Sequence, residues 1–90
     1  MEDSLGKKFL RVEVIVPNYK EQMAYEGFVK SLTSSNSEGT FDILPMHENF
    51  VTVVEGKVVV VDEGGKTRDF EVGKAVIEAS NNFIKVFVQF

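Results

Sequence analysis

The chain has 90 residues, of which 43% are hydrophobic and 27% charged, and this composition is typical of one small folded domain rather than a disordered chain. Its net charge of −4, with ten scattered Lys and Arg residues, argues against nucleic-acid binding, because neutralising phosphates needs clustered cations. The absence of cysteine excludes disulfide frameworks, thiolate metal sites and cysteine nucleophiles.

No apolar run approaches the ~18 residues that a membrane span needs. The N-terminus, residues 1–6, is acidic and lacks the basic region and apolar core of a signal peptide. We therefore expect a soluble chain without direct membrane insertion. Residues 1–8 are expected to form a flexible tail, and residues 9–90 one folded domain.

Alternation of apolar and polar residues predicts strands from the first part of the chain onward. The first strand is expected at residues 9–16 and ends at Pro17, because proline cannot donate to a sheet ladder. A second extended stretch is expected at residues 23–32, with a bulge or bend at Gly27. Residues 33–39 are polar and rich in turn formers, which predicts an exposed loop.

The second part of the chain predicts short strands separated by tight turns. Turns are expected at Glu55-Gly56, at residues 63–65 and at Asn81-Asn82, where asparagine tolerates the left-handed backbone. The strands between them are expected at residues 40–44, 50–54, 57–61, 66–72, 75–79 and 83–90. About eight to ten short strands at this spacing predict an all-β fold, a small two-sheet β-sandwich or flattened barrel.

An ordered set of segments over residues 10–90 matches a known family. The opening strand at residues 10–17 is followed by Met-Ala-Tyr-Glu-Gly-Phe-Val at residues 23–29 and by Phe-Asp-Ile-Leu-Pro-Met-His at residues 41–47. Residues 70–73 and 76–82 also fall where that family has counterparts. This order resembles the N-terminal β-sandwich domain of the epsilon subunit of F-type ATP synthases, called delta in mitochondria.

The sequence departs from the family pattern at a few positions. The family often has glycine where Asp42 and Met46 stand, and usually two glycines near Gly73, which is followed here by Lys74. Longer members continue into a helical hairpin beyond the position of Phe90. The sequence therefore resembles a form without this hairpin, either a naturally short member or a part of a longer one, and the inhibitory and nucleotide-sensing roles of some relatives are not carried over.

The resemblance implies a non-catalytic rotor-stalk subunit that supports coupling and assembly at the cytoplasmic side of the bacterial plasma membrane. Its expected partners are the gamma subunit and the c-ring, and no cofactor, metal or small-molecule substrate is expected. By resemblance, the gamma interface lies at Pro17, His47, Phe50 and Thr52. The c-ring interface lies at the loop tip, at Ser37, Glu38, Gly39 and Thr40.

The same residues also have simpler interpretations. His47 is the only histidine, and a histidine at a strand end is commoner than a metal ligand. Residues 35–40 can be an ordinary solvated loop, and Phe50 can be a core residue. Phe83, Phe87 and Tyr19 fall on the polar side of their strands. We expect Phe83 and Tyr19 to cover the sandwich, and Phe87 either to cover it or to mark an interface.

Two other functions are compatible with parts of the sequence. From His47 to residue 58 the chain resembles part of a cupin, a small metal-binding barrel, in which Asp42, Glu48 or Glu55 would have to complete the site. A cupin would hold manganese, iron or zinc, and usually binds its metal with two or three histidines. The second alternative is a β-sandwich interaction domain with an unrelated partner, because a fold does not imply a function.

Overall fold

The computed structural model describes residues 9–17 and 21–89, which form six strands. The expected tail at residues 1–8 and the expected covering residue Tyr19 lie outside the described residues. No helix occurs within the described ranges, and so none that is long and apolar enough to cross a membrane. The strands are β1 (Leu10–Pro17), β2 (Glu21–Asn36), β3 (Gly39–Ile43), β4 (Phe50–Asp62), β5 (Thr67–Ser80) and β6 (Phe83–Gln89).

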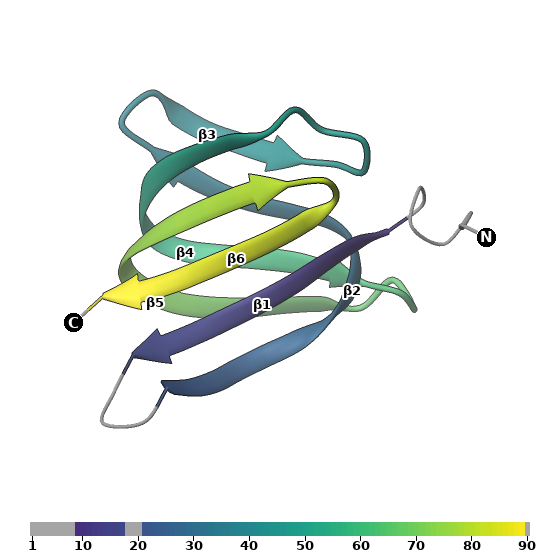
Figure 1. Cartoon of the computed structure of the whole chain (residues 1–90), viewed down its shortest axis with the longest axis horizontal. Coiled ribbons are helices and arrows are strands. Elements are labelled where there is room, and N and C mark those ends of the chain that lie inside the picture. The colour runs from purple at the N-terminus through teal and green to yellow at the C-terminus, as the bar shows by residue number, and fades with distance from the viewer. Residues whose placement is uncertain (1–8, 18–20, 90) are drawn as a thin grey trace.

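The strands form one sheet that closes on itself. Their order is β1-β6-β5-β4-β2-β3, and an additional pairing of β1 with β2 joins the ends of a five-stranded ring, leaving β3 attached to β2 (Figure 1). All pairings are antiparallel except that of β1 with β6. Closure removes most unpaired sheet edges. The predicted all-β fold, a β-sandwich or flattened barrel, is confirmed.

Two paired glycines form a corner at which β4 and β5 pass from one layer to the other. Gly56 faces Gly73 across the two strands, and both have positive φ, of 95° and 66°. The register shifts between Gly56 and Lys57, which leaves Val72 without a partner in the pairing. Figure 1 shows both strands curving at the same side of the molecule. The part of β5 after the corner pairs with β6, and the part of β4 after it pairs with β2.

This corner explains why the strands are fewer and longer than expected. The predicted hairpin turn at Glu55-Gly56 does not exist, because β4 continues from Phe50 to Asp62, opposite a bulge at Val72 of β5. The strands expected at residues 66–72 and 75–79 are likewise one strand, β5. Glycine supplies the positive φ that either a tight turn or a bulged corner needs, so the dipeptide did not distinguish them. The turns at residues 63–65 and at Asn81-Asn82 are present.

Residues 33–36 also form strand rather than the expected loop. They pair with residues 39–42 of β3, and only Ser37 and Glu38 remain in the turn. The Thr33 hydroxyl donates to the Asp42 carboxylate at 2.7 Å, and the Ser34 hydroxyl, buried, donates to the Lys57 carbonyl oxygen at 2.8 Å. Cross-strand partners of this kind let a polar segment form strand that composition alone assigns to a loop.

The bend expected at Gly27 lies elsewhere. Gly27 pairs regularly with Val12, whereas the register shifts between Val14 and Ile15. A Cβ added at Gly27 would lie 3.4 Å from the Tyr25 hydroxyl, so the Tyr25 side chain covers this glycine closely.

A single core of aliphatic residues fills the interior. It is built from the inward-facing positions of all six strands, as period-two alternation requires. Its members are Leu10, Val12, Val14, Val29, Leu32, Ile43, Val54, Val58, Val60, Val72, Ala75, Ile77, Ala79, Ile84, Val86 and Val88.

Candidate interaction surface

The residues predicted to contact the c-ring lie at the tip of the β2–β3 hairpin, Ser37 and Glu38 in the turn and Gly39 and Thr40 at the start of β3. All four are exposed, and Gly39 has a φ of 119°, which favours glycine. The turn is held from its base, where Asn36 Oδ1 accepts the backbone N–H of Glu38 at 2.8 Å and the Ser35 and Thr40 hydroxyls lie 3.2 Å apart. These contacts leave the Glu38 carboxylate projecting at the tip of the hairpin.

Three of the four residues predicted for the gamma contact lie beside this hairpin. Asn36 Nδ2 donates to the Thr52 hydroxyl at 3.1 Å, which ties the end of β2 to the first part of β4. The Phe50 ring packs edge-on against Phe41, with centroids 6.3 Å apart. Phe50 and Thr52 share the inward-facing side of β4 with buried Val54 and are only half-buried themselves. They therefore support the surface from within.

His47 precedes β4 and packs edge-on against the Phe50 ring, with centroids 6.3 Å apart. Its Nδ1 donates to the Glu48 carbonyl oxygen at 2.7 Å, while Nε2 is buried without a hydrogen-bond partner among the described residues. Among the residues that the structure describes, no three His, Cys, Asp or Glu side chains come close enough to hold a metal ion. His47 thus lies at an aromatic contact beside a strand end.

The outward side of the first part of β4 carries an apolar row that continues across three more strands. Val53 pairs with Val76, Val76 with Phe87, and Phe87 with Ile15. Val53 is 51% exposed, and the other three are half-buried. We call these four residues the apolar row. Val51, in the next row, is 66% exposed and enlarges the patch.

Charged residues flank the apolar row on both sides. One flanking row consists of Glu78, Lys85 and Glu13 beside Val51, and the other contains Lys74 paired with Glu55 at 3.9 Å. An apolar centre with a charged rim is the usual composition of a protein–protein interface. Sequence reasoning missed Val51, Val53, Val76 and Ile15. Alternation from the buried positions would have placed all four outside, but it would not have shown that Val53, Val76 and Ile15 share one row with Val51 beside it.

Pro17 and the aromatic residues of β6 can be placed relative to this row. Pro17 lies two residues beyond Ile15, at the end of β1, away from the β2–β3 hairpin. Phe87 belongs to the apolar row, so its position fits an interface better than a cover. Phe83 lies in a different row, with the Lys85 ammonium 5.3 Å from its ring centroid.

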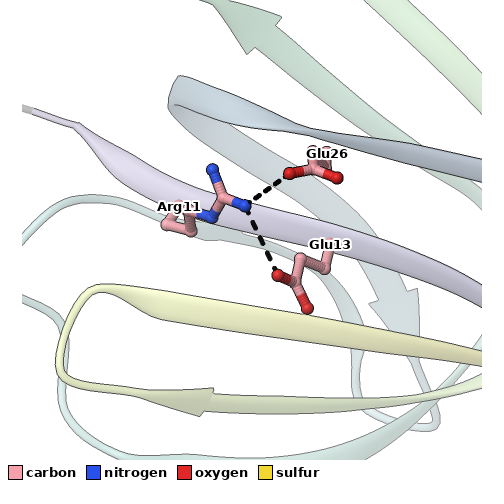
Figure 2. A network of polar contacts seen from close by, with 3 residues as sticks. All are labelled: Arg11, Glu13 and Glu26. Carbon is pink, nitrogen blue, oxygen red and sulfur yellow. Dashed lines mark hydrogen bonds and ion pairs between the residues drawn. The ribbon is translucent and has the colours of Figure 1, made fainter. Parts of the chain in front are cut away.

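Electrostatic contacts fix the other end of the molecule. Arg11 lies 2.7 Å from Glu26 and 3.5 Å from Glu13 (Figure 2), and its hydrogen bond to Glu26 raises the pKa of the guanidinium. Asp62 accepts the backbone N–H groups of Lys66 and Gly64 at 2.9 Å and 3.0 Å. These bonds, the one from Lys66 foremost, hold the pKa of Asp62 below its usual value. The first cluster joins β1 to β2, and the second stabilises the turn between β4 and β5.

Comparison with known proteins identifies the family. The family model of the ATP synthase delta/epsilon chain, β-sandwich domain, matches residues 9–90. The ATP synthase epsilon chain of Leptospira borgpetersenii is 35% identical over 77 residues, which cover 86% of this chain and 58% of the relative. That of Nitratiruptor sp. is 26% identical over 81 residues, which cover 89% of this chain and 60% of the relative. The chain spans less than two thirds of the length of these relatives.

Solved structures share the fold. The chain matches a chain of the Euglena gracilis mitochondrial ATP synthase with a TM-score of 0.72 at 19% identity, covering 98% of this chain and 57% of the other. It matches a chain in the central stalk and c-ring of the Tetrahymena thermophila mitochondrial enzyme with a TM-score of 0.67 at 18% identity, covering 90% and 63%. The family match removes the basis for the cupin interpretation. The chain belongs to the family of ATP synthase delta/epsilon chains, in which residues 9–90 are the β-sandwich domain.

Proposed function

We propose that this domain is a non-catalytic component of the rotor stalk that links the gamma subunit to the c-ring of an F-type ATP synthase. The observation that carries the proposal is the combination of two surfaces on one closed sheet. An exposed polar hairpin tip, residues 37–40, lies beside an apolar patch that spans four strands. One surface can hold each partner.

The gamma subunit is assigned to the face that carries the apolar row. Val51 and Val53, 66% and 51% exposed, would be largely desolvated by a packed partner, and burying apolar area favours association. His47, Phe50 and Thr52 lie at or under the hairpin end of this face, and Pro17 lies at its other side. The predicted gamma contacts therefore surround the patch rather than form its centre.

The c-ring is assigned to the hairpin tip at residues 37–40. Its exposed Glu38 is suited to basic loop residues of a partner, and charge complementarity of this kind contributes mainly to orientation and specificity. Asn36 joins this turn to β4 through Thr52 at 3.1 Å.

The closed sheet suits a part that transmits force, because close-packed cores deform little. The curated relatives named above are bacterial proteins, which supports a position at the cytoplasmic side of the plasma membrane, reached through the complex rather than by insertion. On this proposal the domain supports coupling and assembly and carries out no chemistry.

The first test is co-expression of this chain with the gamma subunit of the same organism, followed by size-exclusion chromatography. We expect a one-to-one complex. Elution of two separate, folded proteins would contradict the gamma assignment. For the c-ring, the purified complex would be added to rings in detergent, and the Glu38→Lys variant should bind less than the wild type.

A further inference from the structure

A groove runs between the β2–β3 hairpin and the first part of β4. It has a volume of about 720 Å³. From the hairpin it is lined by Ser35, Asn36 and Ser37, and from β4 by Val51, Thr52, Val53 and Glu55.

The lining of this groove shows that it lies against the edge of β4. Successive residues of a strand point to opposite faces. Thr52 shares the inward side of Val54, whereas Val51 and Val53 point outward. Because residues of both sides line the same groove, the groove follows the backbone edge and not one face of the strand.

Along the first part of β4, before Val59, this edge has no paired strand within the described residues. On one side, β4 pairs with β5 from Phe50 to Val61. On the other side it pairs with β2 only from Val59 to Asp62. Alternate residues of an antiparallel strand direct their N–H and C=O groups away from the paired neighbour. The residues before the glycine corner therefore present backbone donors and acceptors to the groove.

The corner at Gly56 explains why β2 and β4 separate. After it, β4 lies in the layer of β2, and before it, in the layer of β6. Two side-chain hydrogen bonds span the opening in place of a backbone ladder, from the Ser34 hydroxyl to the Lys57 carbonyl oxygen at 2.8 Å and from Asn36 to Thr52 at 3.1 Å. The hairpin and β4 thus diverge into a wedge.

We propose that this groove receives an extended segment of the gamma subunit, which displaces the Asn36–Thr52 hydrogen bond and adds as a strand to the edge of β4 at residues 51–55. The inference rests on the proposed function, since it names how gamma would bind. An open strand edge beside a groove is the arrangement used in β-strand addition, where the main chain supplies affinity and side-chain positions supply specificity.

The lining also defines the chemistry of the segment. Glu55 is the only charged residue of the lining, and its side chain is 71% exposed. A lysine or arginine on the partner segment near the corner would complement it. At the outward positions, Val51 and Val53 favour apolar side chains on the segment at every second residue.

Amide hydrogen exchange tests the proposal. Exchange would be followed by NMR on the isotope-labelled chain, alone and bound to unlabelled gamma subunit. Within residues 51–55, the amides that face the groove should exchange fast in the free chain and at least about a hundredfold more slowly in the complex. Amides that face β5 should be slow in both states, and those of the turn at residues 63–65 should exchange at the same rate with and without gamma.

The possible outcomes separate this proposal from the proposed function. A complex that forms while the groove-facing amides keep their exchange rates would overturn strand addition and leave the gamma assignment standing. The absence of a complex would overturn both. Protection of these amides in the chain alone, rising with its concentration, would also overturn the proposal, in favour of a second copy.

A pair of variants provides an independent readout. Ser37→Trp places a large ring at the groove, and Glu63→Trp places the same ring on the β4–β5 turn. We expect Ser37→Trp to weaken gamma binding by about tenfold or more, and Glu63→Trp to bind like the wild type, with both chains folded by circular dichroism. Equal affinities of the two variants would overturn strand addition at this groove.

Discussion

Glu13 of β1 and Glu26 of β2 stand directly opposite each other in the antiparallel register. Like charges in this position destabilise a sheet. Arg11, two residues from Glu13 on the same side of β1, reaches both carboxylates, at 3.5 Å and 2.7 Å (Figure 2). Its guanidinium lies 5.6 Å from the Phe28 ring centroid. One cation thus offsets the repulsion between two carboxylates where the sheet closes.

Removal of this cation should therefore cost more than loss of an ordinary surface ion pair. Arg11→Met is expected to lower the free energy of unfolding by about 1 kcal/mol, as measured by urea denaturation. Adding Glu26→Gln should restore much of the loss, because it removes the repulsion. The control is Lys57→Met in the exposed pair with Asp69, 3.7 Å apart, which should change little. Equal effects of Arg11→Met and Lys57→Met would refute this account.

The glycine corner predicts a second effect on stability. Gly73 has a φ of 66°, and no atom lies within 4 Å of the position of an added Cβ. The cost of a substitution is therefore conformational and not steric. Gly73→Ala should lower the free energy of unfolding by about 1–2 kcal/mol, and Gly73→Asn by less, because asparagine tolerates this backbone better. Equal losses for both in denaturant titrations would contradict a backbone origin.

The stability of the chain should depend on pH through Asp62. Its folded pKa is depressed by hydrogen bonds from Lys66 and Gly64 and by Arg68. The stabilisation is therefore present above the unfolded pKa and is lost as the pH falls through the folded pKa. We expect the urea concentration at the unfolding midpoint to fall as the pH is lowered below about 4, and this fall to be smaller in Asp62→Ala. An equal fall of the urea midpoint with pH in both proteins would show that other carboxylates are responsible.

The apolar row predicts a variant that loses binding but keeps its fold. Val53 is 51% exposed, so Val53→Asp should change the free energy of unfolding by less than about 0.5 kcal/mol. Its affinity for gamma, measured by calorimetry, should fall by more than about tenfold. Val86→Ala is the matched contrast, because Val86 is fully buried and its truncation should cost about 1–3 kcal/mol. Unchanged affinity in Val53→Asp would remove this face from the interface.

The hairpin tip predicts an effect on coupling alone. The turn is held by Asn36 through the Glu38 backbone N–H and not through its carboxylate. Glu38→Lys should therefore leave the melting temperature unchanged while reducing proton-driven ATP synthesis in the assembled enzyme. Glu63→Lys, on the other exposed turn, should alter neither. A large fall in melting temperature for Glu38→Lys would assign the residue to the fold instead.

Much of the local structure follows from the sequence, because the information lies within a few residues. Alternation in β1 and β6 determines which side chains face the core, and the pair Asn81-Asn82 determines a turn with positive φ, at 53° and 61°. The all-β class and the family resemblance have the same local origin. The alternation and the turn residues each depend only on residues within one strand or one turn.

The features that only the tertiary structure determines depend on contacts between residues far apart in the chain. Gly56 needs a positive φ in either a hairpin or a corner, and only Gly73, opposite in β5, makes it a corner. That corner separates β4 from β2 and opens the groove. Likewise, alternation places Val53 and Phe87 outside, but the pairing register brings them into one apolar row. Period two within a strand specifies a face, whereas alignment between strands is set by long-range packing and hydrogen bonding.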